Sequence, residues 1–223
     1  MKSAIIFDMD GTLFQTNLIL EPALEATFDY LRAKGQWKGE TPIEQYREIM
    51  GVPLSVVWEA LCPMHSIDQH NDSNSFFQQA LIELIKQGKG ALYKGVANTL
   101  EQLSEKYPLF IASNGQTAYL QEIVTYYRLD QWIKSVYSID LIASGNKSEL
   151  VGLVKQENQI GCGFVIGDRS SDIKAAVDNS FTSIGVRFDF AQEEELAAAD
   201  FIIEDFRELQ SIVKSELLKL NKV

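Results

Sequence analysis

The chain has 223 residues, of which 46% are hydrophobic. This length exceeds one typical domain of about 150 residues but falls short of two. We therefore expect one core domain that carries a smaller insertion. No apolar run approaches about 18 residues, so the sequence predicts no membrane-spanning helix. The formal net charge of −11 argues against a nucleic-acid partner, which would need a basic surface, but it leaves room for a small anionic ligand beside local cations.

The N-terminal sequence and the cysteines indicate where in the cell the protein is expected. Met1-Lys2-Ser3 enters an apolar stretch directly and lacks the long apolar region and cleavage site of a signal peptide. Cys62 and Cys162 lie far apart and have no metal-ligand spacing, which favours reduced, partly buried thiols. We expect a cytoplasmic protein.

The first strand ends in two carboxylates. Ile5-Ile6-Phe7 is a short apolar run typical of a buried parallel strand, and Asp8 and Asp10 follow it before Gly11 indicates a turn. In open α/β sheets, ligands bind at the carboxyl ends of the strands. Carboxylates held this close repel each other unless a cation lies between them or one is protonated, and Mg2+ prefers such oxygen ligands. An ordinary turn with a helix cap is the alternative for this stretch alone.

Residues 15–90 form the expected insertion, and residues 1–14 and 91–223 form the expected core domain. The insertion has helical periodicity and no convincing buried strand. We expect its helices over Glu21–Lys34, Pro42–Met50, Pro53–Leu61 and Ser75–Lys86. Thr41-Pro42-Ile43-Glu44 has the spacing of a capping box. This block follows the first strand immediately, so it is predicted to lie above the carboxylates.

From Gly95 onward, strands and helices alternate. We expect strands at Leu109–Ala112, Ser135–Ile139, Gly163–Ile166, Thr182–Val186 and Phe201–Ile203. Helices are expected over Val96–Lys106, Thr117–Tyr127, Lys147–Glu157, the segment through Val177, Glu193–Ala198 and Phe206–Leu220. This alternation predicts an α/β fold with a Rossmann-like, doubly wound parallel sheet, covered by helices on both faces.

Three of the expected strands end in polar clusters. Asp8 and Asp10 follow the first strand, Ser113 and Asn114 follow the second, and the segment Gly167–Asp172 follows the strand at Gly163–Ile166. Parallel strands bring these clusters to one edge of the sheet, which describes a site.

Each cluster also has a simpler interpretation when it is taken alone. Ser113-Asn114-Gly115 could cap the next helix, and Asp168 and Asp172 could serve the first turn of another, where acids are favourable. Lys147 could be a solvated lysine, although a cation at a helix start opposes the helix dipole. All of these alternatives would have to hold together to exclude a site.

Four segments of the chain resemble, in order and spacing, the four motifs of the haloacid dehalogenase superfamily of phosphohydrolases, in particular its phosphoglycolate-phosphatase-like members. These segments are Asp8-Met9-Asp10-Gly11-Thr12-Leu13, Ser113-Asn114, Lys147 and Gly167-Asp168-Arg169-Ser170-Ser171-Asp172. The insertion resembles that superfamily's C1-type helical cap. The resemblance covers nearly the whole chain.

The resemblance implies a role for each matching residue. Asp8 attacks phosphorus and becomes phosphorylated, and Asp10 protonates the leaving alcohol and then activates water. Ser113, with Asn114 beside it, binds a phosphoryl oxygen, and Lys147 offsets the charge on Asp8 and on the phosphoryl group. Asp168, a carboxylate of Asp8 and the backbone carbonyl of Asp10 hold Mg2+. Asp172 is either a ligand through water or an orienting residue.

The chain departs from the family pattern at several positions. Gln15 stands where many phosphoglycolate-phosphatase-like members have an acid, and Lys147 lacks the following proline common in those relatives. Arg47, before Ile49-Met50-Gly51-Val52-Pro53, resembles an inward-reaching position of C1 caps and could contact a second anionic group. An exposed helical arginine is the alternative.

The expected function is that of a Mg2+-dependent phosphatase acting on a small phosphorylated metabolite. The resemblance also fits a phosphomutase of the β-phosphoglucomutase type, which retains the phosphoester in its product. A non-catalytic binding protein on the same scaffold is a third interpretation, against which Asp8 and Asp10 count. The expected partner is a small phosphorylated substrate, with no nucleic acid and no membrane.

Overall fold

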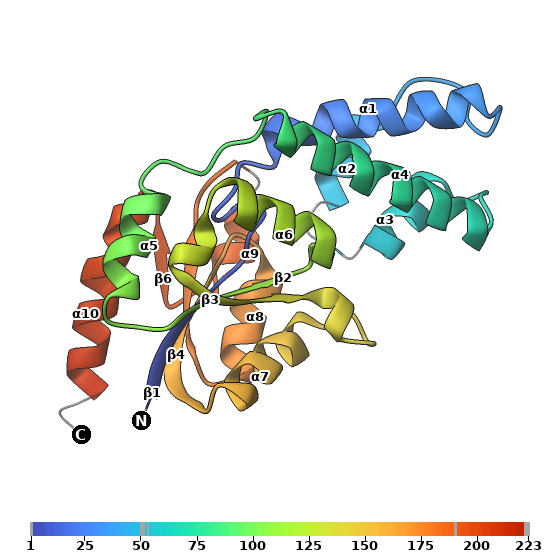
Figure 1. Cartoon of the computed structure of the whole chain (residues 1–223). Helices are drawn as coiled ribbons and strands as arrows, with labels where there is room; N and C mark the ends of the chain where they lie inside the picture. Colours follow the sequence, from blue (N-terminus) through green and yellow to red (C-terminus); the bar gives the residue numbers. More distant parts are fainter. Residues whose placement is uncertain (1, 50–51, 53, 190, 221–223) are drawn as a thin grey trace.

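The structure is a computed structural model that describes residues 2–49, 52, 54–189 and 191–220. Within these residues, six strands form one parallel sheet in the order β3-β2-β1-β4-β5-β6 (Figure 1). The strands are β1 (Lys2–Phe7), β2 (Leu109–Ser113), β3 (Ile133–Ser138), β4 (Ile160–Gly167), β5 (Thr182–Val186) and β6 (Phe201–Ile203). This confirms the predicted Rossmann-like parallel sheet.

The central strand β1 lies between β2 and β4. Phe7 is in register with Ile111 of β2 and with Ile166 of β4, so the polar residues that follow all three strands emerge at one edge. Alternate residues of β1 enter different apolar clusters, since Ile5 belongs to one cluster and Ile6 to the other. Both faces of the sheet are therefore covered, as expected for a doubly wound fold.

Helices cover the two faces of the sheet. One face packs against α5 (Val96–Ser104), α6 (Thr117–Tyr126) and α10 (Leu209–Leu220), and the other packs against α7 (Lys147–Glu157) and α8 (Ser170–Asp178). A short helix, α9 (Glu193–Leu196), and three 3-10 turns, η1 (Leu129–Gln131), η2 (Ile139–Leu141) and η3 (Phe206–Glu208), complete the core. The last turn replaces the expected start of the final α-helix.

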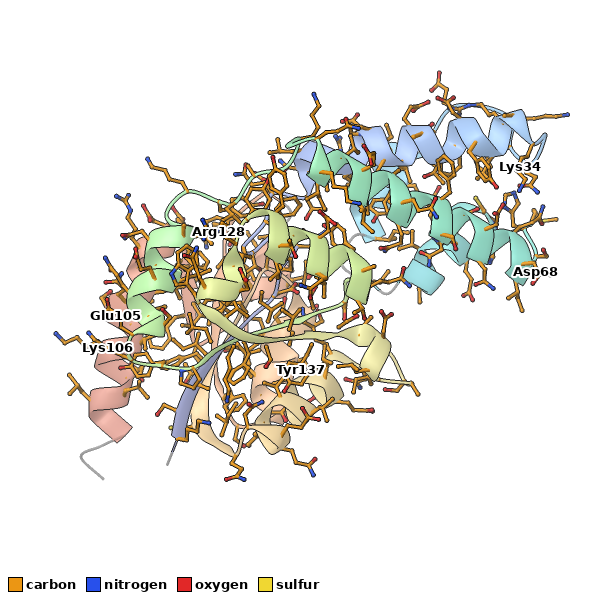
Figure 2. All side chains as sticks on the ribbon, in the orientation of Figure 1. Lys34, Asp68, Glu105, Lys106, Arg128 and Tyr137 are labelled. Atoms are coloured by element: carbon orange, nitrogen blue, oxygen red, sulfur yellow. The ribbon has the colours of Figure 1, made fainter. Side chains whose placement is uncertain are left out.

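Four helices between β1 and α5 form what we call the helical insertion: α1 (Asn17–Ala33), α2 (Ile43–Ile49), α3 (Leu54–Leu61) and α4 (Ile67–Lys86). They lie to one side of the sheet, and α4 packs against α6 (Figure 1). Lys34 and Asp68 mark the end of the insertion that is remote from the sheet (Figure 2). Phe28, Trp58 and Phe77 form its aromatic core.

Two helices of the insertion begin earlier than predicted. α1 begins at Asn17 and contains Pro22, while α4 begins at Ile67 and not at Ser75. The N-terminus of α4 is fixed by a capping box, in which Ser66 accepts from the Gln69 N–H and the Gln69 side chain accepts from the Ser66 N–H.

Two predicted helix boundaries in the insertion, Met50 and Pro53, lie outside the described residues. Among the helices that the structure describes, none is long and apolar enough to cross a membrane.

Candidate active site

Asp8 begins the loop that leaves the carboxyl end of β1. Its backbone N–H bonds to the Ile166 carbonyl at 2.8 Å, which holds the residue beside β4. Its side chain lies 2.9 Å from Nζ of Lys147, which also forms an ion pair with Asp172. Both Asp8 and Lys147 are buried. One lysine therefore neutralises part of the charge of two buried carboxylates.

Lys147 is the first residue of α7, and its position depends on the helix cap. The Asn146 side chain caps the helix by accepting a hydrogen bond of 2.8 Å from the Ser148 N–H. Burial alone would lower the pKa of Lys147, but Asp172 and Asp8 outweigh it and raise this pKa above its usual value. The side chain therefore stays cationic beneath the site.

The loop after β4 supplies two more buried carboxylates. Asp168 accepts a hydrogen bond of 3.1 Å from the Thr12 hydroxyl. Asp172 lies in the first turn of α8 and accepts from the Arg169 N–H at 3.1 Å. Oxygens of Asp8, Asp168 and Asp172 all lie within 4.8 Å of one another. The carboxyl edge of the sheet thus brings Asp8 next to two acids from the other end of the chain, Asp168 and Asp172.

Gly11 makes room for this cluster. Its φ of +70° is in the left-handed region, and a Cβ at this position would overlap the Asp168 carboxylate. A glycine therefore serves both the turn and the close approach of Asp168.

The charges of the cluster indicate what it can bind. Burial, followed by the charges of Asp8 and Asp172, raises the pKa of Asp168 well above its ordinary value. Burial also raises the pKa of Asp172 to about 6, even though Lys147 lowers it. A divalent cation would relieve this excess of negative charge, and the all-oxygen donor set fits Mg2+. The residues present therefore fit the metal ion that the sequence predicts.

The Asp10 carboxylate forms hydrogen bonds with two hydroxyl groups. Its Oδ1 accepts hydrogen bonds from the Thr16 hydroxyl at 2.5 Å and from the Tyr119 hydroxyl at 2.6 Å. Burial, followed by the charge of Asp8, raises its pKa to about 6. A carboxyl group with this pKa can both give and take a proton near neutral pH, which is the property that an acid/base group needs.

Ser113 and Asn114 lie at the carboxyl end of β2, on the other side of Asp8. The Ser113 hydroxyl oxygen accepts from the Gly115 N–H at 3.1 Å, and the Ser138 hydroxyl donates to the Gly115 carbonyl at 2.7 Å. These bonds tie the loop to β3. Ser113 and Asn114 both line the cavity described next.

A cavity of about 70 Å3 lies between this edge of the sheet and the helical insertion. Its core side is lined by Asp8, Asp10, Ser113, Asn114, Gly115, Tyr119, Asp168 and Arg169, and its other side by Thr16, Leu20, Tyr46, Val52, Phe77, Gln78 and Leu81. The cavity has room for roughly five water molecules. Asp8, Asp10 and Asp168 therefore line a partly open cavity that suits a small ligand.

Arg47 does not line this cavity. It lies on α2, where its guanidinium pairs with Glu44 at 2.7 Å and with Glu21 at 3.3 Å, and 43% of its side chain is exposed. Among the sequence-predicted residues, the structure thus brings together Asp8, Asp10, Ser113, Asn114, Lys147, Asp168 and Asp172, and it places Arg47 elsewhere.

Sequence reasoning missed Thr16, Tyr119 and Gln78. The only signal for Tyr119 is its place in the helix that follows the Ser113 loop, and its hydrogen bond to Asp10 spans 109 residues. Thr16 lies just after the first motif, and Gln78 lies on the cavity side of α4.

Comparison with known proteins places the chain among hydrolases. The family described as haloacid dehalogenase-like hydrolase matches residues 5–186. A pyrophosphatase PpaX of Anoxybacillus flavithermus is 26% identical, over 95% of this chain and 96% of its own. A 5'-nucleotidase of Pseudomonas aeruginosa is 22% identical, over 87% of this chain and 86% of its own.

The structure of CbbY from Rhodobacter sphaeroides in complex with phosphate has a similar fold, with a TM-score of 0.81, 20% identity, and coverage of 94% of this chain and 96% of that one. The chain is thus a hydrolytic enzyme with a Rossmann-like fold. It belongs to the haloacid dehalogenase-like hydrolase family.

Proposed function

We propose that the protein is a Mg2+-dependent phosphatase that removes the phosphoryl group from a small phosphorylated metabolite by way of a phosphorylated Asp8. The observation that carries this proposal is the arrangement at Asp8, which has Lys147 at 2.9 Å and oxygens of Asp168 and Asp172 within 4.8 Å. Phosphoryl transfer is catalysed mainly by alignment and by neutralisation of charge. This buried cluster supplies both.

Asp8 and Asp168, with the backbone carbonyl of Asp10, would hold Mg2+. Asp172 would act through water or by orienting Lys147, with which it is paired. When bound, the metal ion supplies positive charge to the carboxylates and to the phosphoryl oxygens. Lys147 adds a fixed positive charge beside Asp8.

The reaction has two steps. In the first, an oxygen of Asp8 attacks phosphorus, the ester P–O bond breaks, and Asp10 gives its proton to the leaving oxygen. In the second, Asp10 takes a proton from a water molecule, the water oxygen attacks phosphorus, and the bond to Asp8 breaks. Inorganic phosphate leaves and Asp8 is regenerated. The pKa of Asp10, raised to about 6, suits both proton transfers.

The remaining residues position the substrate. Ser113 and Asn114 would contact the phosphoryl oxygens, because both line the cavity next to Asp8. Residues 15–90 would act as a cap domain on the core, 1–14 and 91–223, and would exclude bulk water during transfer. Names among the similar proteins, including the pyrophosphatase, the 5'-nucleotidase and a probable phosphatase IndB of Dickeya dadantii, support phosphate-ester or phosphoanhydride hydrolysis.

The test is phosphate release from sugar phosphates, nucleotides, phosphoglycolate and pyrophosphate, with Mg2+ or with EDTA. We expect Mg2+-dependent release from at least one of them, and a loss of at least about 1,000-fold in Asp8→Asn because the nucleophile is absent. A thermal unfolding curve confirms that the variant is folded. Isomerisation of a sugar phosphate without net release, or full activity of Asp8→Asn, would contradict the proposal.

A further inference from the structure

Gln78 is a buried polar residue whose hydrogen bonding is incomplete. It lies on α4, its side chain lines the cavity, and only 8% of the residue is exposed. Its carboxamide oxygen has no hydrogen-bond partner among the described residues. A buried acceptor without a partner costs about 1–3 kcal/mol, so a group that enters the cavity with a hydrogen-bond donor would be stabilised here.

On the insertion side of the cavity, none of the lining residues that the structure describes is charged. Apart from Gln78 and Thr16, its described lining residues are apolar or aromatic: Leu20, Tyr46, Val52, Phe77 and Leu81. Met50, Gly51 and Pro53, which lie outside the described residues, are uncharged residue types. The described lining residues of the insertion therefore supply no positive charge to a ligand in the cavity.

On the core side, both cations that the structure describes at the site, Lys147 and Arg169, are already paired with carboxylates. Lys147 is shared by Asp8 and Asp172, and four carboxylates, Asp8, Asp10, Asp168 and Asp172, surround the site. Arg169 lines the cavity, and its charge is paired with Glu195, to which Nε and Nη2 donate hydrogen bonds of 2.8 and 2.9 Å. Its Nη1 is buried and has no hydrogen-bond partner among the described residues, so it could donate to a neutral acceptor. A carboxylate or second phosphate on the leaving group would therefore lose its hydration without gaining an unshared cation.

We propose that Gln78 is a specificity-determining residue that selects phosphate monoesters whose leaving group is uncharged and bears a hydroxyl group. The hydroxyl donates to the Gln78 carboxamide oxygen, while the apolar walls exclude a second anion. This inference rests on the proposed phosphatase function and narrows its substrate class.

Three small esters of matched size separate the contributions. Glycerol 3-phosphate has a neutral leaving group with hydroxyls, propyl phosphate has no hydroxyl, and 3-phosphoglycerate carries a carboxylate in place of a terminal hydroxymethyl group. We expect kcat/KM to be highest for glycerol 3-phosphate. Propyl phosphate should be about three- to tenfold lower, the effect of one hydrogen bond, and 3-phosphoglycerate should be lower again by at least about tenfold.

The variant Gln78→Leu tests the residue itself. It should lower the ratio of kcat/KM for glycerol 3-phosphate to that for propyl phosphate from about three- to tenfold to about one, since leucine keeps much of the volume and loses the acceptor. The matched control is Gln79→Leu, because Gln79 is the next residue of α4 and is exposed. It should change neither value. A thermal unfolding curve like that of the wild type shows that Gln78→Leu is folded.

The outcomes are distinguishable. Asp8-dependent release that is fastest with 3-phosphoglycerate or pyrophosphate, or an equal loss on all three esters in Gln78→Leu, overturns the inference and leaves the phosphatase proposal standing. Absence of Asp8-dependent release from every ester and from the wider substrate panel overturns both.

Discussion

The Tyr119 hydroxyl and the Thr16 hydroxyl donate to the same oxygen, Oδ1, of Asp10. Tyr119 comes from the core helix α6, and Thr16 immediately precedes α1 of the insertion. Two donors on one oxygen fix the rotation of the carboxyl group and leave its other oxygen for proton transfer. Tyr119 is therefore a positioning residue for the proposed acid and base.

Tyr119→Phe should move the pH dependence of turnover. A hydrogen bond to the ionised carboxylate lowers its pKa, so its loss should raise the pKa of Asp10 above about 6. A bond worth about 0.5–1.5 kcal/mol corresponds to about half to one pH unit. We expect the limb of the kcat/KM profile that belongs to Asp10 to move upward by that amount.

Tyr46→Phe is the control for this measurement. Tyr46 is buried and lines the same cavity, and neither hydrogen bond to Asp10 Oδ1 comes from it. Its pH profile should match that of the wild type. An equal displacement in both variants would show that the Tyr119 hydrogen bond does not set the pKa of Asp10.

Lys147→Met should destabilise the metal-free protein by about 3–5 kcal/mol, because it leaves Asp8 and Asp172 as unpaired buried charges. Urea unfolding in EDTA measures this loss. Lys174→Met is the control, since Lys174 forms an exposed pair with Asp178 and should cost no more than about 0.5 kcal/mol. Similar losses in both variants would contradict the role of Lys147 as the counter-charge of the cluster.

The metal-free protein should lose stability as the pH rises from about 4 to about 6. Burial raises the pKa values of Asp10 and Asp172 from 3.8 to about 6, so in this window the folded state binds more protons than the unfolded state. Above the window, the folded state carries the full repulsion of its carboxylates.

Mg2+ should reverse this loss, because it binds the ionised carboxylates. Thermal unfolding with Mg2+ and with EDTA should show a larger increase of Tm by Mg2+ at about pH 7.5 than at about pH 5. An equal increase at both pH values would place the binding of Mg2+ away from these acids.

Gly11→Ala should impair metal binding as well as stability. Gly11 and Gly35 have φ values of +70° and +69°, so an added Cβ strains both backbones alike, by about 1–2 kcal/mol. A Cβ at Gly35 has no atom within 4 Å, whereas at Gly11 it would overlap the Asp168 carboxylate. Isothermal titration with Mg2+ should show weaker binding only in Gly11→Ala. Unchanged affinity in that variant would separate Asp168 from the metal site.

The carboxyl edge of the sheet could be predicted from the sequence because each site residue directly follows an apolar strand or begins a helix. The register of Phe7 with Ile111 and Ile166 then brings Asp8, Ser113 and Asp168 together. The predicted start of α4 was wrong because Asp68–Asn74 is polar and lacks a clear apolar period. The helix instead begins after Ser66, where a capping box fixes its N-terminus.

Contacts that cross from one element to another could not be predicted in this way. The bond from Tyr119 to Asp10 and the place of Gln78 depend on how α6 and α4 pack, and no local pattern encodes that packing. Arg47 shows the same limit, since its pairing with Glu21 and Glu44 and its absence from the cavity lining depend on how α1 and α2 pack.

The most direct test of the account is to trap the phosphorylated enzyme. The protein is mixed with a hydrolysable ester and Mg2+ and quenched in acid, and borohydride then reduces any acyl phosphate to the corresponding alcohol. Peptide mass spectrometry should find homoserine at position 8, dependent on both ester and Mg2+. Homoserine at position 10 or 168 in place of position 8 would contradict the account.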